Sequence, residues 1–557
     1  MSEAPFLDRI FIQLKHRADV PVLSELHEGQ TESVTGTQLL TRISAARRFL
    51  LAASLRKGDR CVLLANNGVG WVAANLAVMA EGLISVPLYA RQAPVELVAM
   101  MQDCSPSLII CGDETLRQGI ASLWKEAPRL VLLSEVTDGE ATSQEARLLL
   151  SDADPVTIIY TSGTSGVAKG VILTVGNVSH MLTCTSARLD LLMDSPIVRH
   201  EQDRVFHYLP FCFAGSWILL LTCLQRGCQL ALNADLNKLA GDLRCSAPDY
   251  FLNVPALLER MRRAVDEQLW QAGGVVRAVY IRAKGAWVRK QERVSQVFDG
   301  FWLGLANALV FPTIRKKMIG SNLKALICGS APLTVETQLF YSMLGIRVLQ
   351  VYGLTETTAI CTMDDPRQVE PGRVGPAIPG VEMKLGESEE ILVRGPNVFL
   401  GYWNRPEETA SVLCDGWFRT GDQGEVDADG NWKIVGRIKN LVILGSGHNI
   451  APEPIEDKIM QRLVGAQQVV VVGDGRGYLS AIITGKVEGS SVQAALDAVN
   501  LELPHYKQVR AFLVRKEAFS IENGLLTANG KLKRDAIAKT LSAEIEEMYR
   551  AKIGAAS

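Results

Sequence analysis

Residues 161–170 combine small, hydroxylated and cationic side chains in a way that suits the binding of a polyphosphate. They read TSGTSGVAKG and follow the apolar run VTIIY at 156–160. Glycines let backbone N–H groups approach phosphate oxygens, the hydroxyls add donors, and Lys169 supplies positive charge. The segment is not a Walker A loop, which needs Gly-Lys-Ser/Thr, because Ala168 precedes the lysine and Gly170 follows it. A polar surface loop is the alternative; the apolar run before it favours a phosphate loop.

Further segments place polar residues next to apolar runs. They are GSAPL at 329–333, YGLTETT at 352–358, GWFRTGD at 416–422, GRIKN at 436–440 and NGKLKR at 529–534. Taken alone, a carboxylate such as Asp422 is usually a turn residue. In the same way, Lys531, Lys533 and Arg534 read as an ordinary solvated basic run. Chemistry is therefore indicated by the set and not by any one member.

A glycine-rich stretch at 469–478, VVVVGDGRGY, has a different interpretation. Its third glycine is misplaced for a dinucleotide fingerprint, and the strand-like LSAIIT follows where a helix would be needed. Gly and Asp between two apolar runs favour a hairpin turn. The sequence therefore predicts two paired strands here.

The elements that position these residues alternate between strand and helix patterns. RCVLLAN at 60–66 predicts a strand, WVAANLAVMAEG at 71–82 a helix and LISVPLY at 83–89 a second strand. The same short apolar runs recur as LIICGD, VTIIYTSG, QLAL, YFLNVP, LKALICGSAP and RVLQVYGLTE. Strand, helix, strand is typical of a parallel sheet with crossover helices, whose ligand sites collect at the carboxyl ends of strands. Most of these runs end in small or polar residues.

The pattern changes after about Val381. EMKLGESEEILVRG and GEVDADGNWKIVGR carry turn residues at short intervals, which predicts a small antiparallel subdomain. Beyond Arg437 we expect a compact α+β segment with a helix in PEPIEDKIMQRL and a charged terminal helix. The predicted fold class is α/β, with a large N-terminal body of parallel and mixed sheets followed by a small mobile C-terminal domain.

Composition bounds the function classes. The chain has 557 residues, 48% of them hydrophobic, and a net charge of −2. This length predicts several domains. Because positive and negative side chains are nearly balanced, a nucleic-acid groove is disfavoured. The eleven cysteines are scattered without a Cys-x-x-Cys pair, as expected for reduced thiols in a cytosolic protein. Glu3 and Asp8 precede any apolar run, so we infer no export signal. The predicted location is cytoplasmic.

Two apolar stretches raise the question of a membrane. Val205 to Gln225 holds no Asp, Glu, Lys or Arg, yet His207, Pro210 and Gly215 break its pattern, which favours a buried core segment. The second stretch, 300–314, reads GFWLGLANALVFPTI and runs into three basic residues. It is too short to span a bilayer but suits peripheral contact with a membrane surface. The alternative is a helix packed on the body.

Taken together, YTSGTSGVAKG at 160–170 and the five segments above resemble the adenylate-forming superfamily of acyl-CoA synthetases, luciferases and peptide-synthetase adenylation domains. They stand in family order with family-like spacing, and the resemblance covers nearly the whole chain. Within that superfamily the chain is most similar to long-chain fatty acyl-CoA synthetases, through FLNVPALLERM at 251–261, an insertion at about 263–321, and the C-terminal LPHYKQVRAFLVRKEAFSIENGLLTANGKLKR.

This resemblance implies a set of contacts with ATP and Mg²⁺. Thr164 and Glu356 would hold the metal, Tyr352 would stack on adenine with Gly329 and Ser330 opposite, and Asp422 would accept from the ribose hydroxyls. Lys531 would stabilise the charge that develops when a carboxylate meets the α-phosphate, so the implied catalytic residues are Lys531, Glu356 and Thr164. The full implied set of ATP and AMP contacts is Thr161, Ser162, Gly163, Thr164, Ser165, Gly166, Lys169, Gly329, Ser330, Tyr352, Gly353, Thr355, Asp422, Arg437, Lys439 and Lys531.

The resemblance also implies sites for the acyl chain and for CoA. In LPFCFAGSW at 209–217 the family's usual histidine is replaced by Phe213, which would enlarge the apolar lining. Trp217 matches an indole that gates the fatty-acid tunnel, with a buried core Trp as an equal alternative. Gly445, Gly447 and His448 would line the thiol tunnel.

The two half-reactions imply two domains. We expect an adenylation domain at 1–438 and a mobile C-terminal domain at 439–557, which rotates about a hinge near Lys439. Relative to the family, Ala168 stands where Pro is common and Val175 where His often stands.

Three functions fit these residues. The leading prediction is a fatty acid–CoA ligase for medium- or long-chain acids, which forms acyl-AMP and then acyl-CoA. The second stops at acyl-AMP and passes the acyl group to the phosphopantetheine of a carrier protein. The third is a catalytically impaired lipid-binding protein, suggested by Phe213 and opposed by the retention of Glu356, Asp422 and Lys531.

Overall fold

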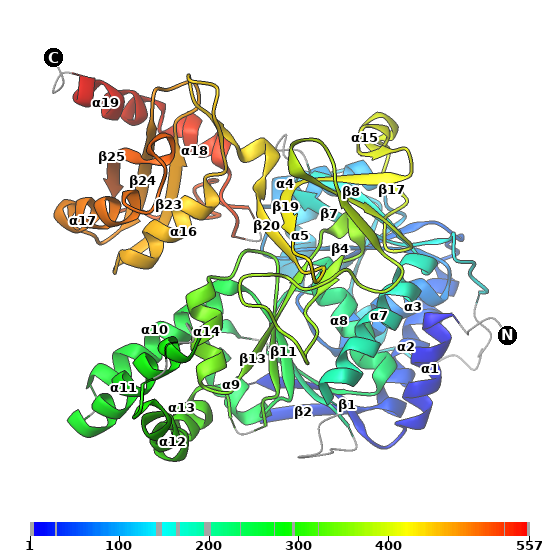
Figure 1. Cartoon of the computed structure of the whole chain (residues 1–557). Coiled ribbons are helices and arrows are strands. Elements are labelled where there is room, and N and C mark those ends of the chain that lie inside the picture. The colour runs from blue at the N-terminus through cyan, green and yellow to red at the C-terminus, as the bar shows by residue number, and fades with distance from the viewer. Residues whose placement is uncertain are drawn as a thin grey trace. The chain divides into compact units, whose positions relative to one another are not determined.

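The chain folds as two compact units, shown in the computed structural model of Figure 1. The first comprises residues 1–382, 393–418 and 428–432, and the second comprises 383–392, 419–427 and 433–557. The structure describes residues 5–27, 30–140, 148–162, 168–193, 202–233, 235–271, 273–291, 294, 296–320, 322–527 and 530–553.

The first unit contains an eight-stranded sheet that is mainly parallel. Its order is β14 (Thr362–Met363), β13 (Arg347–Tyr352), β12 (Ala325–Cys328), β11 (Tyr250–Asn253), β9 (Arg204–His207), β10 (Gln229–Asn233), β1 (Pro21–His27) and β2 (Gln30–Thr35). The inner strands pair in parallel, and β2 and β14 close the two edges antiparallel. Every strand expected here from an apolar run is present.

A seven-stranded sheet forms the other half of this unit. Its order is β17 (Gly401–Tyr402), β8 (Ala168–Thr174), β7 (Pro155–Ser162), β4 (Ile84–Leu88), β3 (Arg60–Leu64), β5 (Leu108–Cys111) and β6 (Arg129–Leu132). Strands β4, β3, β5 and β6 are parallel, whereas β7, β8 and β17 form antiparallel pairs. The carboxyl end of β7 therefore continues directly into the predicted phosphate loop.

Helices cover both sheets. Those of the first unit are α1 (Phe6–His16), α2 (Gly36–Ala52), α3 (Val69–Ala80), α4 (Pro94–Cys104), α5 (Glu114–Leu123), α6 (Leu133–Thr137), α7 (Val175–Met193), α8 (Ala214–Arg226), α9 (Leu239–Ser246), α10 (Pro255–Gln271), α11 (Gly274–Gln291), α12 (Asp299–Leu309), α13 (Phe311–Met318), α14 (Val335–Met343) and α15 (Pro406–Val412). The apolar stretch 205–225 contains a strand and a helix, β9 and α8, and most of its large side chains are buried, which confirms the predicted core segment. No helix in the described chain is long and apolar enough to cross a membrane.

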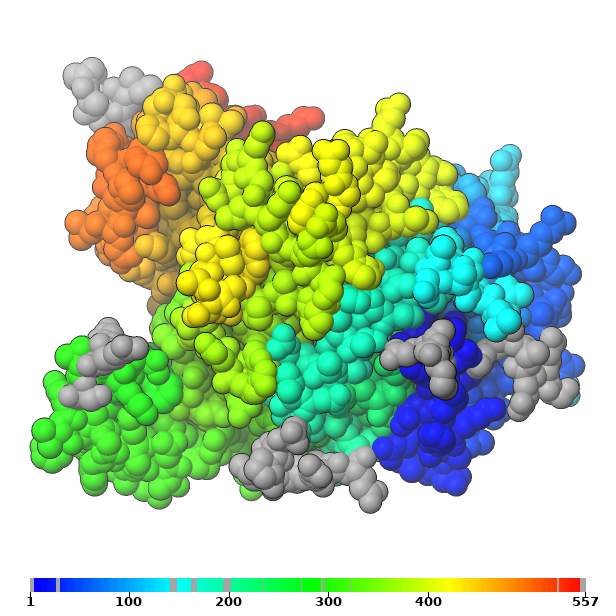
Figure 2. All heavy atoms as spheres, turned by 45° about the vertical axis from the view of Figure 1, so that its right-hand side comes forward, coloured from blue at the N-terminus to red at the C-terminus, as the bar shows by residue number. Residues whose placement is uncertain are grey.

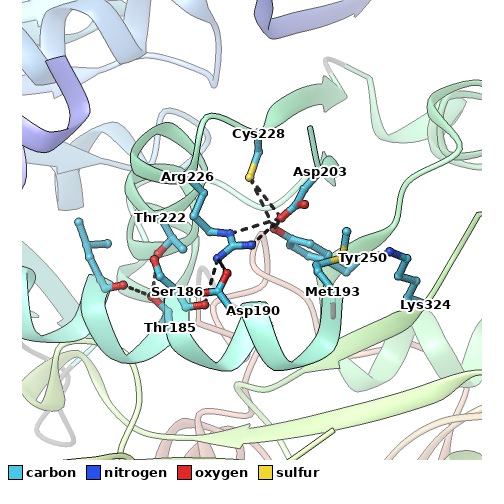
Figure 3. A network of polar contacts seen from close by, with 11 residues as sticks. Thr185, Ser186, Asp190, Met193, Asp203, Thr222, Arg226, Cys228, Tyr250 and Lys324 are labelled. Atoms are coloured by element: carbon cyan, nitrogen blue, oxygen red, sulfur yellow. Dashed lines mark hydrogen bonds and ion pairs between the residues drawn. The ribbon is translucent and has the colours of Figure 1, made fainter. Parts of the chain in front are cut away.

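A largely buried ion pair fastens α7 and α8 to the first sheet (Figure 3). Arg226, at the end of α8, donates to Asp203 Oδ2 at 2.9 Å, and the Tyr250 hydroxyl donates to the same oxygen at 3.0 Å. Arg226 also donates to the Ser186 carbonyl and to Asp190 on α7. Because both charges of a buried pair must be satisfied, this network fixes where the helices sit.

The second unit is built on a three-stranded sheet with helices on both faces. The hairpin β23 (Ala466–Val472) and β24 (Leu479–Gly485) is antiparallel, and β25 (Val509–Arg515) runs parallel to β24. The hairpin predicted for 469–478 is therefore confirmed. The helices are α16 (Glu453–Arg462), α17 (Gly489–Asn500), α18 (Arg534–Thr540) and α19 (Ser542–Ile553). Smaller strands are β21 (Val442–Ile443) and β22 (Asn449–Ile450).

A further sheet has the order β15 (Glu382–Leu385), β16 (Glu390–Arg394), β19 (Trp417–Val426) and β18 (Leu413–Cys414), with β20 (Trp432–Arg437) on β19. These short strands lie where the sequence predicts strand-turn-strand. The α/β body with parallel and mixed sheets and the small C-terminal α+β fold agree with the predicted fold class.

Candidate active site

The β7–β8 hairpin carries the described part of the predicted phosphate loop. Its register places Thr161 opposite Lys169 and Ser162, the last residue of β7, opposite Ala168. Gly163, Thr164, Ser165 and Gly166 lie outside the described residues. Gly170 is required here, because a Cβ atom would lie 2.7 Å from Ile158 Cγ2 and 3.3 Å from Trp403 Cβ.

Lys169 meets two side chains, one from β17 and one from α15. Its Nζ forms an ion pair with Glu408 on α15 and lies 5.1 Å from the centre of the Tyr402 ring. The Tyr402 hydroxyl donates to Glu356 Oε1 at 2.9 Å. Tyr402 therefore links the lysine of the phosphate loop to the carboxylate predicted to hold Mg²⁺.

The segment that carries Tyr402 is fixed by contacts to both β8 and α4. Backbone bonds run from Trp403 N–H to the Gly170 carbonyl at 2.7 Å and from Leu400 N–H to the Ile172 carbonyl at 3.1 Å. Asp103, near the end of α4, accepts from Arg405 at 2.8 Å and from the Tyr160 hydroxyl at 2.7 Å. These bonds hold α15 and Glu408 beside the hairpin.

Glu356 lies on a single 3-10 turn, Thr355–Thr357. The Thr357 hydroxyl accepts from Leu354 N–H at 2.9 Å and closes the turn. Fully buried Asn397 donates to the Thr357 and Ile360 carbonyls, and Thr358 Oγ1 donates to the Asn397 carbonyl at 2.7 Å. The chain around Glu356 is thus held from the other side by a residue that the motif does not contain.

The residues predicted to contact adenine stand at the carboxyl ends of neighbouring strands. Gly329 follows β12, and Tyr352 ends β13, which runs parallel to β12. A Cβ at Gly329 would lie 2.6 Å from Val351 Cγ2, and one at Gly353 would lie 2.4 Å from the Ala359 carbonyl oxygen. Exposed Ser330 has a φ of 73°. Both glycines are therefore needed for close backbone packing at this edge.

Of the two residues predicted to line the acyl site, Phe213 is partly accessible and Trp217 is buried. Phe213 precedes α8 and packs on Tyr89 with ring centres 5.8 Å apart, and burial raises the pKa of Tyr89. Trp217 is fully buried, and its Nε1–H donates to Asn75 Oδ1 at 3.0 Å, while Asn75 donates to Ser85. This is the setting of a core tryptophan, the alternative interpretation of the sequence; gating of an acyl tunnel by Trp217 stays a prediction.

His207 is the described histidine nearest in sequence to the position that Phe213 takes. It is fully buried at the end of β9 and stacks on Phe211 with ring centres 5.0 Å apart. Burial lowers its pKa to about 4. At neutral pH it is therefore an uncharged ring.

In the second unit, Asp422 and Arg437 form one ion pair. Arg437 Nε lies 2.7 Å from Asp422 Oδ1, and the Asp422 side chain is almost fully buried. Asp422 N–H bonds to Thr420 Oγ1, which donates to the Ile391 carbonyl at 2.7 Å. The two residues that the resemblance assigns to one ribose are therefore in direct contact. Lys439 lies in the short turn Ile438–Asn440 directly after β20.

The predicted CoA loop lies between β21 and β22. Gly447 has a φ of 82°, and its N–H donates to the Leu444 carbonyl at 2.8 Å. Gly445 N–H donates to the Arg476 carbonyl at 2.8 Å, so the β23–β24 turn supports this loop. His448 is exposed, bonds to Ser446 Oγ at 2.9 Å through Nδ1 and stacks on Tyr506.

Lys531 is exposed and directly precedes Leu532, which bridges to Leu526. Its N–H donates to Thr527 Oγ1 at 3.1 Å, and its carbonyl accepts from Thr527 N–H at 2.8 Å. The expectation that Arg534 is a solvated basic residue is wrong. Both terminal nitrogens of its guanidinium donate hydrogen bonds to the buried carboxylate of Glu456 on α16.

The predicted CoA loop around Gly447 (the glycine loop) and Lys531 are attached to opposite faces of the β23–β24–β25 sheet. Leu444 and Ile450, beside the loop, share a core with Ile483 on β24. Leu526 and Leu532, beside Lys531, pack on the other core, which contains Ile482. Successive residues of a strand point to opposite faces, so the two predicted functional elements are separated by the thickness of the sheet.

The described residues suit Mg²⁺ only in combination with a phosphate ligand. Among them, no group of three or more His, Cys, Asp or Glu side chains could form a metal cage. Mg²⁺ usually takes one or two carboxylates plus substrate phosphates. Glu356, half-buried close to the phosphate-loop hairpin, fits that arrangement.

Tyr402, Glu408 and Asn397 are the residues of this site that sequence reasoning missed. They come from PNVFLGYWNRPEET at 396–409. The signal that could have found them is the Gly-Tyr-Trp sequence before a Pro-Glu-Glu helix start. Its link to the phosphate loop appears only once β17 pairs with β8.

Comparisons with known proteins agree along the chain. Residues 11–403 match the family described as AMP-binding enzyme, and residues 439–552 match the AMP-binding enzyme C-terminal domain. The long-chain-fatty-acid–CoA ligase FadD15 of Mycobacterium bovis is 27% identical over 96% of both chains. A putative fatty-acid–CoA ligase, fadD11 of Mycobacterium tuberculosis, is 30% identical over 72% of this chain and 74% of its own.

Solved structures share the fold. ATP-bound MatB from Rhodopseudomonas palustris superposes with a TM-score of 0.72 at 24% identity, covering 97% of this chain and 99% of that one. A fatty acyl CoA synthetase of Mycobacterium tuberculosis gives a TM-score of 0.66 at 22% identity, over 97% of this chain and 99% of its own.

Proposed function

The chain belongs to the AMP-binding enzyme family, and from this premise we propose that it is a fatty acid–CoA ligase for medium- or long-chain acids. Its substrates and cofactor are then a fatty acid, ATP, CoA and Mg²⁺. The observation that carries the proposal is the Lys169–Tyr402–Glu356 chain of contacts on the phosphate-loop hairpin. The fatty-acid part is supported by the 27% identity to FadD15 over nearly the full length of both proteins.

In the first half-reaction a carboxylate oxygen of the acid attacks the α-phosphorus of ATP. A new O–P bond forms, the bond to the pyrophosphate oxygen breaks, and acyl-AMP and pyrophosphate result. Lys169 would hold the β- and γ-phosphates, and Glu356 together with Thr164 would hold Mg²⁺, which supplies charge neutralisation. Lys531 would stabilise the charge that develops at the α-phosphate.

In the second half-reaction the CoA thiolate attacks the acyl carbonyl carbon. The C–S bond forms, the C–O bond to the phosphate breaks, and AMP leaves with its electron pair. Buried Asp422, oriented by Thr420 and paired with Arg437, would accept from the ribose hydroxyls in both steps. Gly445, Gly447 and His448 would line the approach of the thiol.

The acyl pocket would be apolar. Phe213 packs on Tyr89 at the position where the family resemblance expects a histidine, so no charged side chain at this position would bind the carboxylate. We propose that the domain boundary lies at 438/439, with the hinge near Lys439, and that residues 439–557 move between the two half-reactions.

ATP–pyrophosphate exchange across acids of increasing chain length, with and without CoA, tests this function. We expect exchange with medium- or long-chain acids, CoA-dependent release of AMP, and loss of exchange in Lys531→Ala. Because Lys531 is exposed, the substitution should leave the fold intact. Accumulation of acyl-AMP that free CoA does not discharge would overturn the ligase in favour of transfer to a carrier protein. Absence of exchange with every acid would overturn catalysis itself.

A further inference from the structure

Exposed apolar side chains of the first unit are concentrated between the end of α10 and the end of α12. The described chain exposes 26 large hydrophobic side chains, and ten of them lie between Trp270 and Leu309. Phe298 is 71% exposed and Phe301 is 60% exposed, although phenylalanine is normally among the most buried residues. Figure 2 shows the green side chains of this part of the chain gathered in one lobe at the lower left.

Positive charge is concentrated on the same segment. Residues 270–320 contain nine Lys or Arg and two Asp or Glu, a net charge of +7, whereas the whole chain carries −2. The remaining residues therefore carry −9. The cationic character is a property of this segment and not of the protein as a whole.

Helix α11 combines both features on its solvent side. Arg277, Ile281, Lys284 and Val288 recur at intervals of three or four residues, so they share one face. Ile281 and Val288 are exposed, whereas Val279, Tyr280 and Ala283 face the core. The helix has five cations and no anion. A solvated helix face normally mixes both signs of charge, and this one mixes cations with aliphatic groups.

Helix α12 and the start of α13 continue this surface. Phe298, Phe301 and Leu309 are exposed, while Ala306 and Val310 are buried. The one charged residue of α12, Asp299, is buried and paired with Arg289 of α11. Lys316 and Lys317 on α13 are exposed. The exposed side of α12 therefore carries no charge, and a cationic pair follows it.

We propose that this surface, formed by Ile281, Val288, Phe298, Phe301, Lys316 and Lys317 (the α11–α13 surface), docks on an anionic lipid bilayer. Helices with aromatic and aliphatic groups beside Lys and Arg bind at the headgroup boundary, where the cations meet lipid phosphates and the apolar groups enter the acyl region. With 11 residues, α12 is too short to span the hydrocarbon core. It would lie in the plane of the surface.

Charge distinguishes a lipid surface from a second copy of the chain. Self-association through this face would bring two segments of +7 together, and the like charges would repel. An anionic bilayer supplies the opposite charge and an apolar medium for Phe298 and Phe301 at the same time.

Flotation of the full chain with vesicles tests the proposal. We expect binding to vesicles of phosphatidylcholine mixed with phosphatidylglycerol, little binding to phosphatidylcholine alone, and a loss of binding at high salt. Each exposed lysine near an anionic surface is worth about fivefold in partitioning. The double variant Lys316→Gln/Lys317→Gln should therefore partition about 25-fold less, and Phe298→Ser/Phe301→Ser should also lose binding.

Matched controls separate this surface from general exposure. Val464→Ser/Leu501→Ser removes two of the most exposed apolar side chains outside it, and Lys125→Gln/Lys486→Gln removes two exposed cations elsewhere. Both should bind as the original chain does, and all four variants should keep the same circular dichroism. Equal binding of every variant, or no binding to anionic vesicles, would overturn the proposal. So would a dimer that Phe298→Ser/Phe301→Ser dissociates.

Discussion

Replacing Tyr402 by phenylalanine removes one oxygen at the centre of the candidate site. The lost hydroxyl donates to Glu356 Oε1 at 2.9 Å. The ring remains, together with its contact to Phe399, whose ring centre lies 4.9 Å away, and its position beneath Lys169 Nζ. Tyr402→Phe therefore tests the orientation of Glu356 without changing the packing.

The size of the effect follows from the kind of hydrogen bond that is lost. A bond to a charged group contributes about 1.5–3 kcal/mol, and Glu356 is only half-buried, so we take the lower end. About 1.4 kcal/mol corresponds to a tenfold change in rate. We expect kcat/KM for MgATP in ATP–pyrophosphate exchange to fall about tenfold. Tyr402→Leu, which also removes the cation–π contact worth about 0.5–1 kcal/mol, should fall two- to fivefold further.

Tyr341→Phe is the matched control. Its hydroxyl donates to the Leu258 carbonyl, also at 2.9 Å, but within the core of the first unit. The free energy of unfolding should drop by about 1 kcal/mol while exchange stays unchanged. If Tyr402→Phe exchanges within twofold of Tyr341→Phe, Tyr402 does not orient a group that the reaction needs, and the role of Glu356 must be reconsidered.

Three further predictions follow from buried or paired charges. Glu408→Gln releases Lys169 from a partly exposed ion pair worth about 0.2–1 kcal/mol. The KM for MgATP should therefore fall up to fivefold. An unchanged or higher KM would contradict the proposal that Lys169 holds the phosphates of ATP. Burial lowers the pKa of His207 from 6.5 to about 4, so the free energy of unfolding falls as the pH drops from 6.5 to 4. Denaturant titrations at pH 7 and pH 4 should show a loss of about 3 kcal/mol from this group, and His207→Leu should abolish it. Burial raises the pKa of Asp364 from 3.8 to about 7, which has the opposite sign: the folded state keeps the proton, and stability is lost as the pH rises from about 4 through 7. Between pH 5 and pH 8 that loss amounts to about 2.5 kcal/mol, and Asp364→Asn should remove it in the same titrations. An equal pH dependence of the free energy of unfolding in Asp364→Asn and in the original chain would show that Asp364 does not titrate there.

The strands that carry the site were predictable because their pattern is local. The apolar runs LKALICGSAP and RVLQVYGLTE give β12 and β13, and the rule that ligands gather at carboxyl ends places Gly329 beside Tyr352. The hairpin at 469–478 was predictable for the same reason, since Gly and Asp between two β-branched runs define a turn. In each case the residues that decide the structure are neighbours in sequence.

The contacts among the site residues depend on pairings between distant segments. Tyr402 reaches Glu356 and Lys169 because β17 adds to β8 across more than 200 residues, and no periodicity in 396–409 indicates that partner. The burial of Arg534 also depends on a partner that is distant in sequence. Within Gly-Lys-Leu-Lys-Arg its type predicts solvation, yet Glu456 on α16 takes it into a buried pair. The exposure of side chains in the insertion at 263–321 could not be predicted either. An amphipathic helix has the same sequence pattern whether its apolar groups are buried, as Phe311 is, or exposed, as Phe301 is.

The second unit constrains how one active site could serve two half-reactions. Lys531 and the glycine loop at Gly447 are attached to opposite faces of the β23–β24–β25 sheet through separate cores. A sheet with side chains on both faces is about 10 Å thick, so a single acyl-adenylate can meet the lysine or the loop but not both at once. If both elements act, the unit must turn between the steps, and a hinge near Lys439 precedes both of them in the chain. The alternation of the domain is then a consequence of sheet geometry, and it requires that Lys531→Ala block acyl-AMP formation while leaving transfer of supplied acyl-AMP to CoA.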